Sequence, residues 1–343
     1  MQFDIKTLEF DKVKEIIINK ASTVKGKELS KEISPTNNAL EIMRLLAETN
    51  QAFDILTRYK EPPFGGIRDL YDTLHKAKIH SVFRPTEFLD VIGLLEATQN
   101  NITFYKNVKE EEIEGEALDE YYLQLESVKG LKNEIQQIIT IDGAVHDTAS
   151  HALSRIRVKI AQKKNKIVER LNNILNTQKT LLAENLITLR GNRMVVPVKL
   201  SEKNNFKGVI IDYSSSGETV YMEPDTVSQI NNEISVLIME ENKEVDRILR
   251  ELTILIADHY GPLMNNFTIL TYLDMTFAKA KFAVQFECTM PIITEDQINL
   301  IKARHPLIDQ HDVVPNTITF DQGQRLIIIT GPNTGGKTVA LKT

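Results

Sequence analysis

A glycine-rich run holds the residues with the clearest chemical potential in this sequence. Residues 331–338 read GPNTGGKT, which meets the spacing G-x-x-x-x-G-K-[ST]. Glycine lets backbone N–H groups turn inward and surround phosphate oxygens, which a Cβ atom would obstruct. The run therefore predicts a loop that binds the phosphates of a nucleotide.

The end of this loop supplies two further chemical groups. Lys337 can place a positive charge against the β- and γ-phosphates, and the Thr338 hydroxyl can ligate Mg²⁺. We therefore expect ATP and Mg²⁺ as cofactors. The residues expected to hold them are Gly331, Pro332, Asn333, Thr334, Gly335, Gly336, Lys337 and Thr338.

The segment before the loop gives it the context that the motif requires. Arg325–Thr330, RLIIIT, is a short apolar run rich in Ile, which is typical of a buried parallel strand. A strand, a glycine-rich loop and the start of a helix then follow one another. The alternative is a glycine-rich turn that holds no ligand, and this context weighs against it.

Two long helices and an insert between them dominate the middle of the sequence. Apolar residues recur every three or four positions over about Thr148–Leu182, with Asp147 as the expected N-cap, and again over about Pro224–Tyr260. We expect these helices to form an antiparallel coiled-coil arm. The insert, about Glu184–Glu223, has alternating and β-branched residues with Gly-Asn and Ser-Ser-Gly turns. It predicts a small antiparallel β-module at the tip of the arm.

The predicted fold class is mainly α, with the start of an α/β domain around the glycine-rich loop. We expect a helical core at 1–147, the arm at 148–183 and 224–285, the β-module at 184–223, and the nucleotide-binding part at 286–343. This last part contains two further expected strands, Gln297–Ala303 and Asn316–Phe320.

The composition is that of an intracellular protein built from long helices. Cys288 is the one cysteine among 343 residues, so an internal disulfide is impossible and a reducing compartment is expected. No apolar stretch reaches membrane-spanning length, and the first residues do not form a signal peptide. We expect a cytoplasmic protein that does not bind a membrane.

Charge is distributed unevenly along the expected arm. The chain carries a net charge of −6, yet Arg155–Lys207 contains thirteen Lys and Arg against three Glu, whereas Gly208–Tyr260 contains eleven acidic residues against three basic ones. Pairing between the two helices is favoured for the lysines at 159, 163, 164 and 166, with Glu240, Glu241 and Glu244 as partners. Contact with nucleic acid is the alternative.

The basic residues of the β-module favour the opposite interpretation. Contact with the phosphates of a nucleic acid is expected there, because most of the returning helix is out of reach. Acidic residues of the module, such as Asp212 and Glu223, could instead neutralise them. The expected contact residues are Arg190, Arg193, Lys199, Lys203 and Lys207.

Other candidate residues point to structural roles. His146 and His151 are five positions apart, so on a helix they face different directions and cannot easily share one metal ion. Phe104 and Tyr105 are expected in the core. His305 is expected to pack or to form hydrogen bonds near the edge of the nucleotide-binding part.

Several segments of the sequence resemble segments of the MutS ATPases, the mismatch-repair clamp family. GPNTGGKT resembles their phosphate loop, and RHPL at Arg304–Leu307 resembles the motif that opens their ATPase domain. PFGGIRDL at Pro63–Leu70 and DYSSSGETVYMEP at Asp212–Pro224 look like segments of the second bacterial class, type-two MutS. LEFDKVKEII at Leu8–Ile17 looks like the start of its helical core, so the resemblance covers essentially the whole chain.

This resemblance implies an architecture and an activity. The arm would be the lever, the β-module the clamp, and the whole protein a homodimeric ATPase whose arms enclose nucleic acid. The family is associated with binding branched DNA to limit homologous recombination, and with splitting collided ribosomes, which would make rRNA a ligand. Its members continue beyond the phosphate loop into a nuclease-like tail, the small-MutS-related domain. We therefore expect this chain to be a truncated piece that carries no catalytic residue and is inactive alone.

Two other classes of protein remain as alternatives. A non-catalytic coiled-coil scaffold would have no reason to keep both Lys337 and Thr338. A chromosome-organising ATPase with coiled-coil arms usually carries its phosphate loop before the arm, whereas here the loop follows it.

Overall fold

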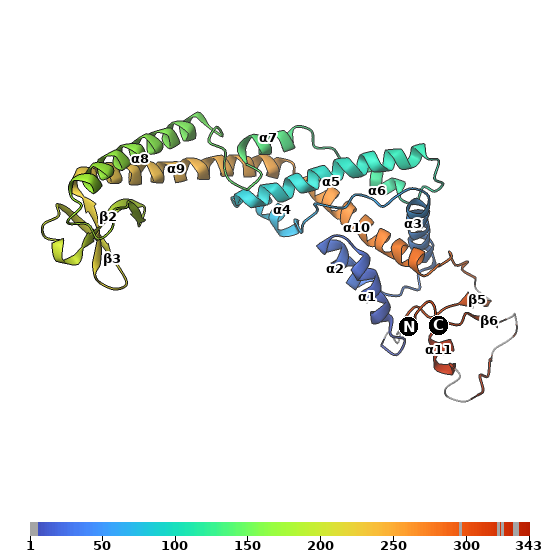
Figure 1. Ribbon diagram of the computed structural model, residues 1–343. Coiled ribbons are helices and arrows are strands. Elements are labelled where there is room, and N and C mark those ends of the chain that lie inside the picture. Colours follow the sequence, from blue (N-terminus) through green and yellow to red (C-terminus); the bar gives the residue numbers. More distant parts are fainter. Residues whose placement is uncertain (1–5, 295–296, 321–322, 324–325, 332–335) are drawn as a thin grey trace. The chain divides into compact units, whose positions relative to one another are not determined.

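The computed structural model describes residues 6–294, 297–320, 323, 326–331 and 336–343. In these residues the chain is mainly helical, with two small antiparallel sheets, so the predicted predominance of helix is confirmed (Figure 1). Contacts divide it into two units. The first unit comprises Met1–His75, Asp90–Lys132 and Asp258–Thr343, and the second comprises Lys76–Leu89 and Asn133–Ala257. The predicted domain boundaries remain predictions.

The elements follow one another as helices, then a small sheet, then helices and a two-stranded sheet. The helices are α1 Phe10–Lys20, α2 Val24–Glu32, α3 Ala39–Arg58, α4 Tyr71–Lys78, α5 Pro85–Glu110, α6 Asp119–Leu123, α7 Leu131–Ile138, α8 His151–Thr177, α9 Asp225–Asp258, α10 Tyr260–Gln285 and α11 Lys337–Lys342. The strands are β1 Thr188–Arg190, β2 Arg193–Lys199, β3 Gly208–Tyr213, β4 Thr219–Pro224, β5 Ile298–Ala303 and β6 Asn316–Phe320, and a short 3-10 helix, η1, spans Leu200–Glu202.

The second unit contains the two long helices expected from the sequence. Helices α8 and α9 lie side by side (Figure 1), and Arg157 pairs with Glu241 at 2.7 Å while Lys163 pairs with Glu233. As the residue number increases along α8, the number of its partner on α9 decreases, so the two helices are antiparallel. Lys163 and Glu241 each fall among the apolar positions of their helix, and these ion pairs give both a charged partner on the facing helix. A coiled-coil arm in the strict sense stays a prediction.

The start of α8 differs from the expectation. The N-cap is Ser150, whose Oγ accepts a hydrogen bond from the Leu153 backbone N–H, and not Asp147. The helix begins at His151, three residues later than expected, and the Asp147 carboxylate instead accepts a hydrogen bond from Arg157. The far end is also earlier than expected, since α8 ends at Thr177.

The insert between these helices forms the predicted antiparallel β-module. Its strands lie in the order β1-β2-β4-β3. The first hairpin turns at Gly191 and Asn192, which both have positive φ, as a two-residue turn between twisted strands requires. Val196, Val198 and Met222 from this sheet pack with α8 and α9 in one buried cluster, which holds the module on the helix pair.

The first unit has its core along α10. That helix packs beside α3 (Figure 1). Phe267, Leu273 and Phe277 of α10 are almost completely buried. Phe104 and Tyr105 of α5 are also buried, as expected. Half of the 26 residues of α10 are buried, and they include polar residues such as Asn266 and Asp274.

A close backbone contact in this unit explains why the PFGGIRDL segment has a glycine at position 66. A Cβ built on Gly93 of α5 would lie 2.5 Å from the carbonyl oxygen of Gly66, which itself has a φ of 89°. Both positions therefore need glycine, one for space and one for its backbone conformation. The loop at 60–70, marked in the sequence by its prolines and glycines, is present.

The strands near the glycine-rich loop agree only in part with the sequence. β5 and β6 form where they were expected and pair with each other in an antiparallel sheet. The expectation of a buried parallel strand at Arg325–Thr330 is wrong for its described part, since residues 326–330 belong to no strand. Leu326 and Ile328 are each 75 % exposed. The physical reason is that, among the described residues, β5 and β6 pair only with each other and offer this segment no ladder.

Candidate nucleotide and nucleic-acid sites

The described ends of the glycine-rich loop line a hollow of about 640 Å³. On one side lie Gly331, Gly336 and Lys337, and on the other lie residues of the segment 305–316. The full lining is His305, Ile308, Asp312, Val313, Val314, Asn316, Ile329, Thr330, Gly331, Gly336, Lys337, Val339, Ala340 and Thr343. The structure thus brings the RHPL segment and the predicted phosphate-binding residues to one site.

The backbone of the hollow fits a phosphate group. Gly331 and Gly336 have φ values of 138° and 80°, and a Cβ on either would meet no atom within 4 Å. The space beside both Cα atoms is therefore open, and both backbone conformations are ones that glycine adopts readily, as a phosphate-binding loop requires. The Lys337 ammonium donates a 2.5 Å hydrogen bond to the Gly331 carbonyl, so it lies across the mouth of the loop.

The other predicted nucleotide-binding residues contribute less to this picture. Thr338, the expected Mg²⁺ ligand, is exposed and is not part of the hollow's lining. Pro332, Asn333, Thr334 and Gly335 lie outside the described residues.

His305 has the packing role that was expected for it. Its side chain is buried, and its Nδ1 accepts a hydrogen bond from the Leu307 backbone N–H at 3.2 Å. In the neutral ring this bond places the proton on Nε2. The histidine therefore fixes the turn of the RHPL segment beside the hollow.

Two of the five basic residues predicted on the β-module are engaged inside it. Arg193 donates to both carboxylate oxygens of Glu223, at 2.9 and 2.6 Å, and to Asn232 of α9. Glu223 is 1 % exposed, so Arg193 neutralises a buried charge. Arg190 stacks 3.9 Å above the Tyr221 ring and pairs with Asp212 at 3.4 Å.

The other three predicted contact residues are freer. The Lys199 ammonium donates to the Thr180 carbonyl at 3.0 Å, a bond that leaves its charge unbalanced. For Lys203 and Lys207, the described residues offer neither a hydrogen bond nor an ion pair to the side chain.

The lysines on α8 do not meet the acids that the sequence suggested. Lys163 pairs with Glu233, whereas Glu241 pairs with Arg157, and Glu244 binds Arg247 and Ser150. The register explains the difference, because position 163 lies opposite position 233. Glu241, one of the expected partners of Lys163, therefore lies eight residues, or about two helical turns, beyond Glu233.

The structure also contains a buried polar cluster that the sequence analysis did not identify. Glu48 of α3 is 1 % exposed and accepts hydrogen bonds from Arg44 at 2.6 Å, Tyr121 at 2.8 Å and Tyr272 at 2.6 Å. Burial, with its hydrogen bonds, raises the pKa of the Tyr121 hydroxyl well above its usual range. The available signal was a glutamate at helical spacing from buried Gln51, Ala52 and Ile55. The cluster cross-links the first unit.

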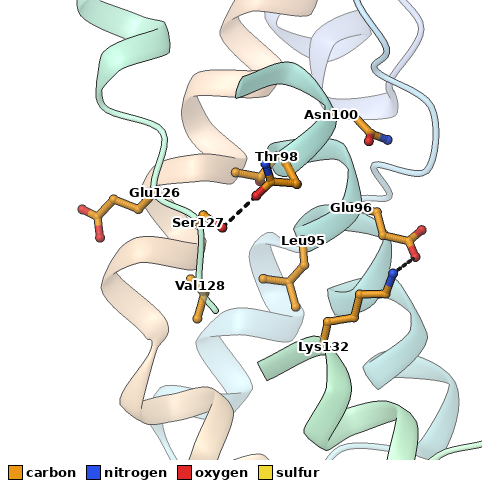
Figure 2. A pocket seen from close by; sticks show the side chains of 9 residues that line it. Leu95, Glu96, Thr98, Asn100, Glu126, Ser127, Val128 and Lys132 are labelled. Carbon is orange, nitrogen blue, oxygen red and sulfur yellow. Dashed lines mark hydrogen bonds and ion pairs between the residues drawn. The ribbon is translucent and has the colours of Figure 1, made fainter. Parts of the chain in front are cut away.

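A second hollow, of about 350 Å³, lies in the first unit between α5 and the segment that leads into α7. Figure 2 shows its side chains, with Lys132 paired to Glu96 at 2.8 Å and Ser127 donating to Gln99 at 2.8 Å. It contains none of the residues predicted to bind nucleotide or nucleic acid.

Comparison with known proteins supports a MutS-like protein of a MutS2-related family. The chain is 37 % identical over 342 residues to endonuclease MutS2 of Geobacillus sp. strain WCH70, which covers 99 % of the chain and 44 % of that relative. It is 36 % identical over 340 residues to endonuclease MutS2 of Clostridium botulinum strain Eklund 17B, covering 99 % of the chain and 43 % of the relative. The putative endonuclease MutS2 of Bacillus subtilis strain 168 is 36 % identical over 342 residues, with 99 % and 44 % covered.

The chain spans less than half the length of these curated relatives. No protein-family model matches it. Among the described residues, no helix combines the length and the apolar character needed to cross a membrane.

Proposed function

We propose that this chain contributes to a MutS2-type ATPase that acts as a homodimer and clamps nucleic acid. The observation that carries the proposal is the hollow in which Gly331, Gly336 and Lys337 meet residues of the RHPL segment. A loop with open glycine backbone and a lysine at its mouth suits the phosphates of ATP. The similarity to MutS2 proteins along 99 % of the chain supports the same class.

In this proposal the chain's own residues bind and orient the nucleotide. Lys337 would leave the Gly331 carbonyl to meet the β- and γ-phosphates, and Thr338 would turn to ligate Mg²⁺. Bound Mg²⁺ would neutralise phosphate charge during hydrolysis. Val313 and Val314 also line the hollow and would contact the rest of the nucleotide.

The proposed substrate is a nucleic acid recognised through its backbone and shape. Branched DNA, held so that homologous recombination is limited, and rRNA of collided ribosomes in the cytoplasm both fit this mode of contact. The β-module would be the clamp at the end of an α8–α9 lever. The relatives' names add an endonuclease activity for the whole protein.

A non-catalytic helical scaffold is the competing function, and nucleotide binding separates the two. We expect the chain to bind a fluorescent ATP analogue, and Lys337→Ala to weaken binding about 10- to 100-fold through loss of a charge-assisted contact. Titration by fluorescence anisotropy measures this. Lys179→Ala, which removes an exposed charge outside the hollow, is the matched control and should leave the affinity unchanged. Equal affinities for the wild type and Lys337→Ala would favour the scaffold.

A further inference from the structure

One flank of α8 carries a row of cations. Arg155, Lys159, Lys163, Lys166 and Arg170 follow one another at spacings of four, four, three and four residues. Side chains at such spacings lie on one side of an α-helix, and the row extends over about 22 Å at roughly 1.5 Å per residue. We call these five residues the basic flank.

The facing side of α9 neutralises little of this charge. Lys163 pairs with Glu233, but Arg170 donates to the Thr226 carbonyl and Arg155 to the His151 carbonyl, which are uncharged. Across the described ranges, no carboxylate comes within ion-pair distance of Lys159 or Lys166. Glu240 is exposed on the same side of α9 but pairs with none of the five. Among the described residues, four of the five cations therefore have no ion-pair partner, although Glu233 also interacts electrostatically with Lys166.

A groove runs beside the basic flank. Its volume is about 750 Å³, and its lining is Lys159, Gln162, Lys163, Lys166, Glu233, Val236 and Leu237. Lys159 and Lys166 are exposed on either side of the Lys163–Glu233 pair. An anionic ligand in the groove would thus meet two uncommitted ammonium groups.

The β-module offers fewer uncommitted cations than its sequence suggested. Arg193 is bound to buried Glu223, and Arg190 is held between Tyr221 and Asp212. Moving either arginine to a phosphate would break an internal contact. Lys203 and Lys207 remain without such a contact among the described residues, and Lys159 and Lys166 of α8 add a second pair of unpaired ammonium groups.

We infer that the basic flank is a binding site for the phosphodiester backbone of a nucleic acid. This inference rests on the proposed function, and it adds a contact surface on the helix pair that the β-module does not supply. Regularly spaced cations along one side of a helix suit a chain of phosphates, and each neutralised phosphate releases a condensed counterion. We expect the contact to be indifferent to base sequence, because ammonium groups spaced along a helix meet backbone phosphates, which are the same for every base.

An acidic helix from another protein suits the groove less well. Such a helix needs a series of apolar positions to pack its own i, i+3, i+4 and i+7 side chains. The groove offers only Val236, 51 % exposed, and the buried Leu237. Charge complementarity without an apolar stripe favours the nucleic acid.

The test measures salt-dependent binding of the full chain to a fluorescein-labelled four-way DNA junction and to an rRNA hairpin. The variant Lys159→Gln/Lys166→Gln removes the two uncommitted ammonium groups. We expect its slope of log affinity against log salt to fall by about 2, at about 0.9 per contact. Affinity near 0.1 M salt should fall by more than about tenfold.

Two double variants serve as matched comparisons, and circular dichroism checks the folding of all three. Lys164→Gln/Lys243→Gln removes two exposed charges outside the basic flank and should change the slope by less than about half a unit. Lys203→Gln/Lys207→Gln removes the freer cations of the β-module. If the wild type binds and only this last variant lowers the slope, the inference about α8 fails while the proposed function stands.

Two further outcomes would also overturn the inference. A wild type that binds neither nucleic acid would contradict the flank and the proposed clamp together. Binding of a fluorescent polyglutamate peptide that is lost in Lys159→Gln/Lys166→Gln, with an unchanged slope for DNA and RNA, would assign the flank to an acidic protein partner.

Discussion

At the scale of single residues, Asp274 in the first unit accepts several hydrogen bonds at once. It is fully buried on α10 and accepts hydrogen bonds from the backbone N–H groups of Ser22 and Thr23. The Thr23 hydroxyl also donates to it at 2.7 Å and caps α2 by accepting from the Gly26 N–H. One carboxylate therefore fixes the start of α2 against the core helix.

We predict that Asp274→Asn lowers the free energy of unfolding by about 2–3 kcal/mol, because charge-assisted hydrogen bonds to buried donors are lost. Urea unfolding followed by far-ultraviolet circular dichroism measures the change. Asp246→Asn is the control, since Asp246 is exposed and pairs only with Arg250 at 3.2 Å, and it should cost less than about 0.5 kcal/mol. Similar losses in both variants would contradict this account.

At the scale of elements, the pairing of α8 with α9 depends on the N-terminus of α8. The Ser150 hydroxyl caps α8 and donates to Glu244 of α9 at 2.7 Å. Hydrogen bonds from Arg247 and then Ser150 lower the pKa of Glu244 to about 2. The cap and the ion pair thus act as one joint between the two helices.

This joint predicts a pH dependence of stability. The folded-state pKa of Glu244 lies below its ordinary value of 4.5, so its contribution is complete above pH 4.5 and is lost as the pH falls toward 2. The difference in melting temperature between the wild type and Glu244→Gln should therefore shrink over that range. Thermal melts at pH 2 to 6 measure it.

A second variant tests the cause. Ser150→Ala removes one of the two groups that donate to Glu244. In this background, the effect of Glu244→Gln on the melting temperature should change less with pH than it does in the wild type. A difference that stays constant from pH 6 to pH 2 would show that Glu244 acts by packing alone.

At the scale of the whole molecule, apolar burial is uneven along the chain. Leu270, Leu273 and Phe277 of α10 are fully buried within a regular helix. Residues 326–329 are apolar as well, but they are exposed and belong to no strand. Their sequence is typical of a strand in a protein core, but the described residues around them do not form a sheet that would bury them.

Hydrogen exchange should show this contrast directly. We predict that amides of residues 326–330 exchange within seconds at neutral pH, while those of Leu270, Leu273 and Phe277 require minutes to hours, because only the helical amides are hydrogen-bonded and buried. Mass spectrometry of peptides from a time course measures both. Equal protection would mean that residues 326–330 are paired in solution.

The sequence by itself determined the features that depend on neighbouring residues. Alternation over the strands β2 and β4 and the three-to-four spacing over α8 and α9 placed these elements within a few residues of their bounds. The Gly191–Asn192 turn could be predicted for the same reason, because the residue types of a two-residue turn are set locally. Spacing in the glycine-rich loop also identified Gly331, Gly336 and Lys337, which meet at one hollow.

The tertiary structure alone decided which distant residues meet. The register of α8 on α9 follows from packing the whole seam at once, and it gave Lys163 the partner Glu233 and left Lys159 uncommitted. Ser150 rather than Asp147 caps α8, and the Asp147 carboxylate meets Arg157, ten residues along the chain. Such outcomes depend on contacts between residues far apart in the chain. The relative energies of these contacts cannot be judged from a short stretch of sequence.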